Sequence, residues 1–331
     1  MLNSDKFDTR PAVKKKRLNV LPANPENADP EKAVGPGRFP SWLHRKLPKG
    51  TELIRTGEVI NEQRVHTVCE EAKCPNLLEC WSKKTATFLV MGKDCTRNCG
   101  FCNIDFSKKP NPLEADEPAR VAESVVQLGL KHVVITMVAR DDLPDGGAHH
   151  LAQVIAAIRA RVADATIEAL TSDFAGNHAS WDTLLDAQPE IFNHNIETVR
   201  ELTPRVRHTA TYDRTLSFLQ YANKHKRHPG MMVKSGLMVG LGENEEQVYQ
   251  TLRDLHEHGC DIITIGQYLQ PNQQKLLVKS FTPPDQFKRY EDYGYSLGVC
   301  HMYCGPFVRS SYNANLVIKQ ANQKVKIINN E

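Results

Sequence analysis

The sequence lacks several features that would assign a protein to a broad class. No apolar run reaches the roughly 18 residues of a membrane-spanning helix. The first residues are charged and proline-rich, without the apolar stretch of an export signal, so we expect a cytoplasmic protein. The net charge is only +3, which gives the whole molecule no electrostatic reason to bind nucleic acid. A glycine-rich dinucleotide fingerprint is also missing, which argues against a nicotinamide-binding fold.

Cysteine, by contrast, is concentrated in one stretch of the chain. Of the nine cysteines, six form two groups of three, each with close spacing. Thiols of a cytosolic protein stay reduced, and an odd number cannot all pair, so the clusters predict metal ligands rather than disulfides. The first group is Cys69, Cys74 and Cys80, spaced C-x4-C-x5-C, and the second is Cys95, Cys99 and Cys102, spaced C-x3-C-x2-C.

The rest of the chain alternates between β-branched runs and helical patterns. Buried strands that alternate with helices predict a parallel sheet, here an α/β fold with an open or partial TIM-like (β/α)6 barrel. The predicted strands are residues 85–92, 132–138, 166–171, 191–196, 232–239 and 262–269. The predicted helices are residues 117–128, 148–162, 180–186, 212–226, 244–258 and 284–297.

Four segments are expected along the chain. Residues 1–40 form a flexible basic and proline-rich arm, and residues 41–84 an N-terminal extension with the first cysteine group. Residues 85–280 form the barrel, and residues 281–331 a C-terminal helix and tail. The basic run at residues 14–17 is either a contact for phosphate or acidic protein or a solvated charge cluster.

The second cysteine group follows the first barrel strand, so we expect it at the C-terminal end of the sheet, where such barrels place their chemistry. Three thiolates with no fourth ligand nearby suit an iron–sulfur cubane with one open iron better than a tetrahedral zinc site. A zinc loop or unliganded thiols are the alternatives. Gly100 permits close backbone approach, and Phe101 could lie against an aromatic ligand.

The segment from Cys95 to Cys102 resembles the signature of the radical S-adenosylmethionine (SAM) superfamily, including the aromatic Phe101 before the last cysteine. The resemblance implies the radical SAM version of the partial barrel, with N- and C-terminal extensions. It also implies that SAM chelates the open iron of a 4Fe–4S cluster. One electron then cleaves SAM to a 5′-deoxyadenosyl radical, which abstracts hydrogen from an unreactive carbon.

The first cysteine group alone is less informative, since a structural zinc or an electron-transfer cluster would suit its spacing. Its flanking residues and several strand ends together resemble the lipoyl synthase family. The matching segments are residues 69–76, 79–81, 85–88, 133–136, 140–148, 192–199, 234–243, 266–271 and 305–312.

That resemblance implies a second, auxiliary 4Fe–4S cluster bound by Cys69, Cys74 and Cys80. Its fourth ligand would be Ser311, the second serine of an Arg-Ser-Ser-Tyr motif at residues 309–312. An alkoxide oxygen is a harder and weaker partner for iron than a thiolate, which suits a cluster that is broken down as the sulfur source.

The implied reaction inserts sulfur at carbons six and eight of an octanoyl chain on a lysine of a carrier protein. The implied carriers are the lipoyl domains of 2-oxoacid dehydrogenases and the glycine-cleavage carrier protein, with a ferredoxin or flavodoxin as electron donor. The rivals are another radical SAM sulfur-inserting enzyme, which would lack the paired triad and serine motif, and a zinc-stabilised binding module.

Other candidate residues each have a functional and a structural interpretation. Gly236, Gly240 and Glu243 either lie along the adenine of SAM or only shape the turn after a strand. Arg309 either steers substrate or stabilises cluster charge as a catalytic residue, or forms a structural ion pair. In the loop at residues 140–147, carboxylates either contact SAM, pair with arginine or cap the next helix.

Three segments depart from the lipoyl synthase pattern. Residues 272–278 stand where His-Leu-Pro is common, residues 171–174 where Pro-Asp-Phe is usual, and residues 137–140 where Ser-Val-Asp-Arg is usual. We expect none of them to touch a cluster ligand, and only carrier docking and local loop geometry to be affected.

Overall fold

A computed structural model describes residues 39–44, 52–83 and 85–311, and the part from Pro40 onward forms one unit. The arm at residues 1–38, with its basic run, and Tyr312 of the serine motif lie outside the described residues. Within the described part, no helix is long and apolar enough to cross a lipid bilayer.

An eight-stranded sheet is the centre of the fold, in the order β1-β2-β5-β6-β7-β8-β9-β10. Every neighbouring pair from β2 to β10 is parallel, and β1 adds to β2 in the antiparallel direction. The strands are β1 His66–Thr67, β2 Thr87–Val90, β5 His132–Met137, β6 Thr166–Leu170, β7 Ile191–Asn193, β8 Met232–Val239, β9 Ile262–Gln267 and β10 His301–Gly305.

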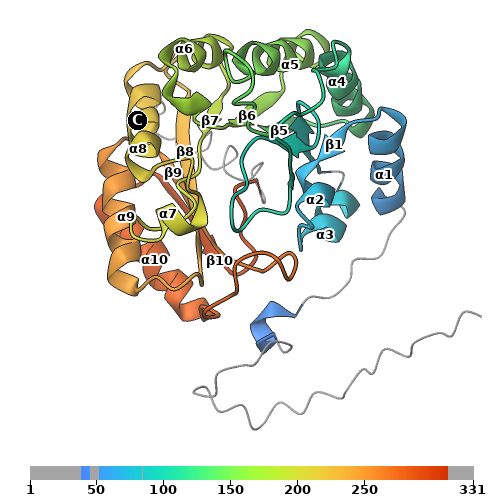
Figure 1. Cartoon of the computed structure of the whole chain (residues 1–331). Coiled ribbons are helices and arrows are strands. Elements are labelled where there is room, and N and C mark those ends of the chain that lie inside the picture. The colour runs from blue at the N-terminus through green and yellow to red at the C-terminus, as the bar shows by residue number, and fades with distance from the viewer. Residues whose placement is uncertain (1–38, 45–51, 84, 312–331) are drawn as a thin grey trace, which may run out of the picture. The chain divides into compact units, whose positions relative to one another are not determined.

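Helices cover the outer side of this sheet, as Figure 1 shows. Their apolar faces pack on strands that are buried along nearly their whole length, which builds one large core. The covering helices are α4 Glu117–Leu128, α5 Ala148–Arg161, α6 His178–Asp186, α8 Tyr212–Lys224, α9 Glu245–Glu257 and α10 Pro284–Leu297.

Smaller elements extend the sheet at its ends. The N-terminal extension contains α1 Glu52–Glu62, α2 Val68–Glu71 and α3 Leu77–Ser82, and it joins the sheet through β1 at the β2 edge (Figure 1). A separate two-stranded ribbon contains β3 Asp94–Cys95 and β4 Asp105–Phe106. The remaining pieces are η1 Ser41–Leu43, η2 Phe174–Gly176 and α7 Thr203–Val206.

The predicted α/β fold with an open, partial barrel is confirmed, since β1 and β10 are the two edges of one sheet among the described residues. All six predicted strands and six predicted helices exist, most with ends within two residues of those expected. The prediction missed β10, which pairs in parallel with β9 through residues 301–305. Its five residues begin soon after the left-handed turn at Gly298 and end in a glycine, a residue with weak strand preference, so the pattern was too short to stand out.

Candidate functional site: two cysteine triads at the ends of the parallel strands

The triad of Cys95, Cys99 and Cys102 lies on the loop between β2 and β4, at the carboxyl end of the sheet as predicted. Besides burial, the charges of Cys102 and Cys95 raise the pKa of Cys99, and that of Cys95 raises the pKa of Cys102, so the three sulfurs lie near one another. Burial is the larger cause, and raises the pKa of Cys99 to about 12 and that of Cys102 to about 11. Such thiols bind a metal only with loss of their protons, so metal binding would release protons here.

Backbone amides point at one of these sulfurs. The Sγ atom of Cys95 accepts hydrogen bonds from the amides of Arg97 at 3.4 Å and Ala139 at 3.3 Å. Hydrogen bonds to a ligand sulfur stabilise its negative charge and tune a bound cluster. The donor set of three thiols with amide support therefore fits a cysteine-ligated cluster.

Arg97 fastens this loop to two neighbouring strand ends. Its guanidinium is buried and makes a bidentate pair with Asp141, at 2.8 Å and 2.6 Å, and a further contact with Asp173 at 2.7 Å. Asp141 follows β5 and Asp173 follows β6, so one arginine joins the cysteine loop to both. Sequence reasoning missed Arg97, although its place inside the cysteine motif was a signal.

Two of the three departures from the family pattern contact a proposed cluster ligand, so the expectation that none would was wrong, and the third contacts the same loop through the pair of Asp173 with Arg97. The amide of Ala139, in the segment 137–140, donates to Cys95 as described above. Leu276 and Lys275, in the segment 272–278, donate to Gly100 O at 2.9 Å and to Cys99 O at 3.4 Å respectively. These contacts use backbone atoms or the end of a long side chain, so the residue types in the two segments did not predict them.

A carboxylate that the sequence did not single out also faces this triad. The charge of Glu197 raises the pKa of both Cys99 and Cys102, which places it beside them. Burial in turn raises the pKa of Glu197, and the neighbouring Arg207 partly offsets that effect. Glu197 also adopts a left-handed backbone with φ of 68°, a conformation that costs energy and is concentrated at functional sites.

The predicted SAM-contacting residues divide into two kinds. A Cβ atom at Gly236 would come within 2.3 Å of Thr264 Oγ1 and 3.1 Å of Asn195 Oδ1, so only glycine fits against these two side chains. Phe101 packs in a small apolar cluster with Val206, Leu241 and Tyr268.

The other two predicted contacts shape a turn. Gly240 has φ of 99°, which favours glycine, and its amide donates to Glu243. The second carboxylate oxygen of Glu243 accepts from the amide of Leu241 at 2.9 Å. The carboxylate therefore caps the turn after β8.

The triad of Cys69, Cys74 and Cys80 lies in the N-terminal extension, on α2, α3 and the turn between them. Burial raises the pKa of Cys69 to about 11 and of Cys80 to about 12, and the neighbouring cysteines raise both further. Local backbone bonds hold the group, such as that from Cys74 N to Cys69 O at 3.0 Å. Three mutually close thiols again fit a cysteine-ligated cluster.

The segment at residues 306–311, called the serine strap here, follows β10 and ends at Ser311. Asn76, between two cysteines of the N-terminal triad, donates from Nδ2 to Phe307 O at 2.8 Å. The strap and the triad, more than 200 residues apart in the chain, are therefore directly bonded. The Nη1 atom of Arg309 donates to Val308 O at 2.7 Å, and the catalytic role of Arg309 stays a prediction.

No group of three or more His, Cys, Asp or Glu side chains in the described part could hold one metal ion, whereas in a cubane each cysteine binds a different iron.

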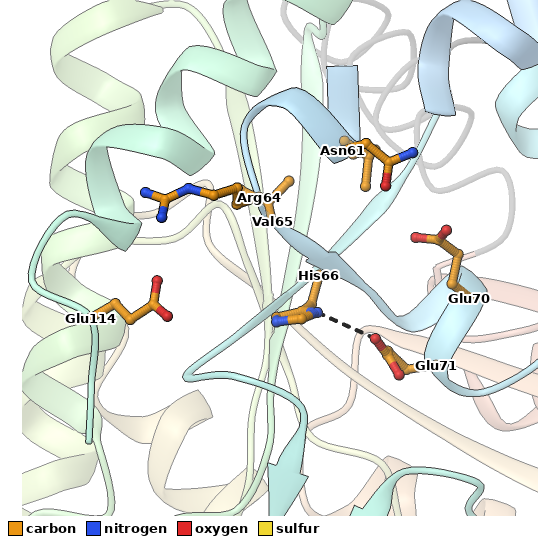
Figure 2. A pocket seen from close by; sticks show the side chains of 8 residues that line it. Asn61, Arg64, Val65, His66, Glu70, Glu71 and Glu114 are labelled. Atoms are coloured by element: carbon orange, nitrogen blue, oxygen red, sulfur yellow. Dashed lines mark hydrogen bonds and ion pairs between the residues drawn. The ribbon is translucent and has the colours of Figure 1, made fainter. Parts of the chain in front are cut away.

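A cavity of about 410 Å³ lies on the N-terminal extension, where Figure 2 shows His66 bonded to Glu71 with Arg64 and Glu114 nearby. Its lining contains no cysteine of either triad, so it is separate from the candidate site.

Comparisons with known proteins agree with this geometry. A model of the radical SAM superfamily matches residues 89–255. The lipoyl synthase of Protochlamydia amoebophila (strain UWE25) is 69% identical over 318 residues, which cover 96% of this chain and 98% of that protein. The lipoyl synthase of Chlamydia muridarum (strain MoPn / Nigg) is 50% identical over 304 residues, or 92% of this chain and 97% of that protein.

A solved structure shares the fold at low sequence identity. Streptococcus suis SuiB bound to S-adenosylmethionine superimposes with a TM-score of 0.53 at 13% identity, over 65% of this chain and 49% of that chain. The likeness supports the partial-barrel architecture and nothing more specific.

Proposed function

The chain belongs to the lipoyl synthase family of the radical SAM superfamily, and from this membership we infer which of its residues serve each part of the reaction. It is a sulfurtransferase that inserts sulfur at carbons six and eight of a protein-bound octanoyl chain, using SAM and two 4Fe–4S clusters. Bound SAM and its cluster supply hydrogen-atom abstraction from unactivated carbon, and the auxiliary cluster supplies sulfur.

Cys95, Cys99 and Cys102 are proposed to hold the SAM-binding cluster. The amides of Arg97 and Ala139 would stabilise the charge on the Cys95 sulfur. Phe101 and Gly236 would flank SAM, the first as part of an apolar cluster and the second on the strand where only glycine fits against Thr264 and Asn195. Gly240 and Glu243 would act through the shape of the turn after β8.

Cys69, Cys74, Cys80 and Ser311 are proposed to hold the auxiliary cluster. The observation that supports this is the hydrogen bond from Asn76 to Phe307 O, because it brings the serine strap to the triad. A serine oxygen is a weaker ligand for iron than a thiolate, so it would release an iron more easily when the cluster gives up sulfur. Arg309 would support the strap through the carbonyl of Val308 and lie close to the substrate.

The enzyme acts on lipoyl carrier proteins. We propose the lipoyl domains of 2-oxoacid dehydrogenases and the glycine-cleavage carrier protein as its partners, and a ferredoxin or flavodoxin in the same cytosolic compartment as its reductant. The proposal of a cytosolic location rests on thiol ligands that need a reducing compartment.

The test combines the reconstituted full chain with SAM, a reductant and a peptide that carries octanoyl-lysine. We expect 5′-deoxyadenosine and a peptide with two added sulfur atoms by mass spectrometry. Ser311→Ala should retain 5′-deoxyadenosine formation and lose most of the doubly thiolated product, while Ser311→Cys keeps a ligand atom at the same place. Ser296→Ala, which removes a hydroxyl exposed on α10, is the matched control. Full product from Ser311→Ala would refute the assignment of Ser311.

A further inference from the structure

The serine strap lies directly on a barrel strand. A Cβ atom at Gly266 of β9 would come within 2.1 Å of Val308 O, so only glycine allows the strap to approach this closely. The strap is therefore seated on the sheet near the carboxyl end of β9 before it reaches Ser311. Its path is set by backbone contact, and the remaining question is what fixes its final residues.

Two buried side chains hold Ser310, the residue next to the proposed ligand. The Nζ atom of Lys234, on β8, donates to Ser310 O at 2.5 Å. The Nδ2 atom of Asn195, just after β7, donates to Ser310 Oγ at 2.6 Å. Both side chains are fixed to strands of the barrel, so the carbonyl and the hydroxyl of Ser310 have defined positions.

Lys234 is itself held by a buried ion pair. Its Nζ atom lies 2.9 Å and 3.0 Å from the two carboxylate oxygens of Glu168 on β6, and the two side chains are 1% and 0% exposed. Glu168 also accepts from Asn193 Nδ2 at 2.7 Å. Although burial alone would raise the pKa of Glu168, the ion pair with Lys234 and the nearby His132 lower it to about 2.

A buried ion pair is a weak source of stability, because desolvation of both charges offsets their attraction. Here the pair has a second connection, since the lysine also donates to the strap. The pair thus fixes an ammonium group inside the barrel that points at one peptide carbonyl. At its other end the strap is bonded to Asn76 inside the N-terminal triad, so it is held on both sides of Arg309.

We propose that Lys234, Glu168 and Asn195 are positioning residues that fix the serine strap, and through Ser310 hold the Ser311 hydroxyl at the auxiliary cluster. None of the three is a ligand. The inference rests on the proposed function, because it takes Ser311 as the fourth ligand. It adds that the barrel interior, and not the N-terminal extension alone, determines how firmly the auxiliary cluster is held.

The test measures the auxiliary cluster by itself. In the full chain, replacing Cys95, Cys99 and Cys102 by alanine leaves the other triad to bind iron. Two variants are made in this background. The first is Ser310→Ala. The second is the double variant Lys234→Met with Glu168→Leu, which removes both charges so that neither is left buried without a partner. Thr183→Ala, a hydroxyl deletion on α6, is the matched control, and the readout is the rate of iron loss to a chelator.

We expect iron loss to accelerate about 10–100-fold in the double variant, the usual effect of losing groups that orient a metal ligand. Ser310→Ala should accelerate it less, and Ser310→Thr should restore the slow rate because it keeps the hydroxyl. Rates equal to the Thr183→Ala control for both Ser310→Ala and the double variant would overturn the proposal. Ser310→Ala leaves the buried pair intact and removes only the hydroxyl that Asn195 contacts, so it tests the role of Asn195 even if the double variant does not fold.

Ser311→Ala in the same background distinguishes a failure of this positioning role from a failure of the proposal that Ser311 is the fourth ligand. If Ser311→Ala does not accelerate iron loss, the ligand assignment fails and the positioning role fails with it. If Ser311→Ala accelerates iron loss but Ser310→Ala and the double variant do not, only the positioning role is overturned. In Mössbauer spectra, Ser311→Ala should remove the iron site with an oxygen ligand if Ser311 is that ligand, and should leave the spectrum unchanged if it is not.

Discussion

The cysteine loop after β2 is joined to several barrel strands, whereas the triad on α2 and α3 is held mainly by its own turns. In the loop, Arg97 bonds to Asp141 and Asp173, and Gly100 bonds to Val206 and Leu276. These partners come from four different parts of the barrel, so the loop cannot move without them. A site that is reused in every turnover needs such a fixed geometry.

The N-terminal triad has fewer long-range ties among the described residues. Cys80 bonds through its amide to Asn76 O at 2.9 Å, within the same short segment. The link from Asn76 to Phe307 is a single side-chain hydrogen bond. A cluster that is taken apart as a reagent suits a segment of this kind, because ligands can separate without disturbing the barrel core.

The strongest test of this contrast removes one cysteine from each triad. Cys99→Ala should abolish 5′-deoxyadenosine formation, because the remaining two thiols cannot hold the SAM-binding cluster. Cys74→Ala should leave 5′-deoxyadenosine formation in place while abolishing the thiolated peptide. Both products are measured in one reaction by chromatography and mass spectrometry. If both variants lost 5′-deoxyadenosine equally, the two triads would not have separate roles.

The second test removes the arginine that fastens the cysteine loop. Arg97→Met leaves the buried Asp173 with Arg214 as its remaining partner, so the cost should lie below the about 3–5 kcal/mol of breaking an isolated buried pair. We expect a matching fall in the free energy of unfolding and partial loss of iron from the SAM-binding cluster. Arg64→Met removes an exposed pair with Asp116 and should change the stability by about 0–1 kcal/mol. Equal effects of the two substitutions would show that the loop is not held by Arg97.

The third test uses pH to probe the barrel beneath the loop. Burial lowers the pKa of His194 to about 4, from 6.5 when exposed, with Arg207 as a second cause. Below pH 6.5 His194 binds a proton in the unfolded chain but not in the folded chain, so the free energy of unfolding falls as the pH drops toward 4. From pH 7.5 to 5.5 the loss should be about 1 kcal/mol for this group.

The measurement compares denaturant unfolding of the parent chain and His194→Gln at both pH values. Glutamine has no proton to gain, so the variant should lose about 1 kcal/mol less than the parent over this range. The comparison removes any acid effect common to both proteins, including that on the clusters. An identical pH dependence would mean that His194 is protonated in the folded protein.

Sequence alone predicted the parts of this molecule that repeat or that form a motif. The alternation of buried strands and amphipathic helices predicted the barrel, because both faces of a parallel sheet must be covered. The spacing of the cysteines predicted two separate metal-binding groups. Resemblance to a family supplied Ser311, which no spacing rule could have connected to cysteines more than 200 residues away.

Contacts that depend on backbone atoms or on tertiary packing were not predictable. The amide of Ala139 faces Cys95 because β5 ends beside β2, and any residue would supply the same donor. Glu197 was not singled out from the sequence. Its backbone has a positive φ just after a strand, and its carboxylate lies near enough to Cys102 for its charge to raise the pKa of that thiol after burial. Lys234 was not singled out from the sequence, because its partner Glu168 is two strands away in the sheet.

The smallest expected effect comes from Lys275, in the segment that departs from the family pattern. Its Nζ atom donates to Asn98 Oδ1 at 3.2 Å and to Cys99 O at 3.4 Å, and its charge lowers the pKa of Cys102 after burial has raised it. A nearby positive charge favours the reduced cluster, so Lys275→Gln should lower its reduction potential. The shift should be modest, since the lysine is half-buried and salt screens it. Lys279→Gln removes the same charge from an exposed position just after the segment and should shift the potential less. Potentiometric titration followed by electron paramagnetic resonance gives both values, and a larger shift for Lys279→Gln would show that net charge, and not the contact with the cysteine loop, sets the potential.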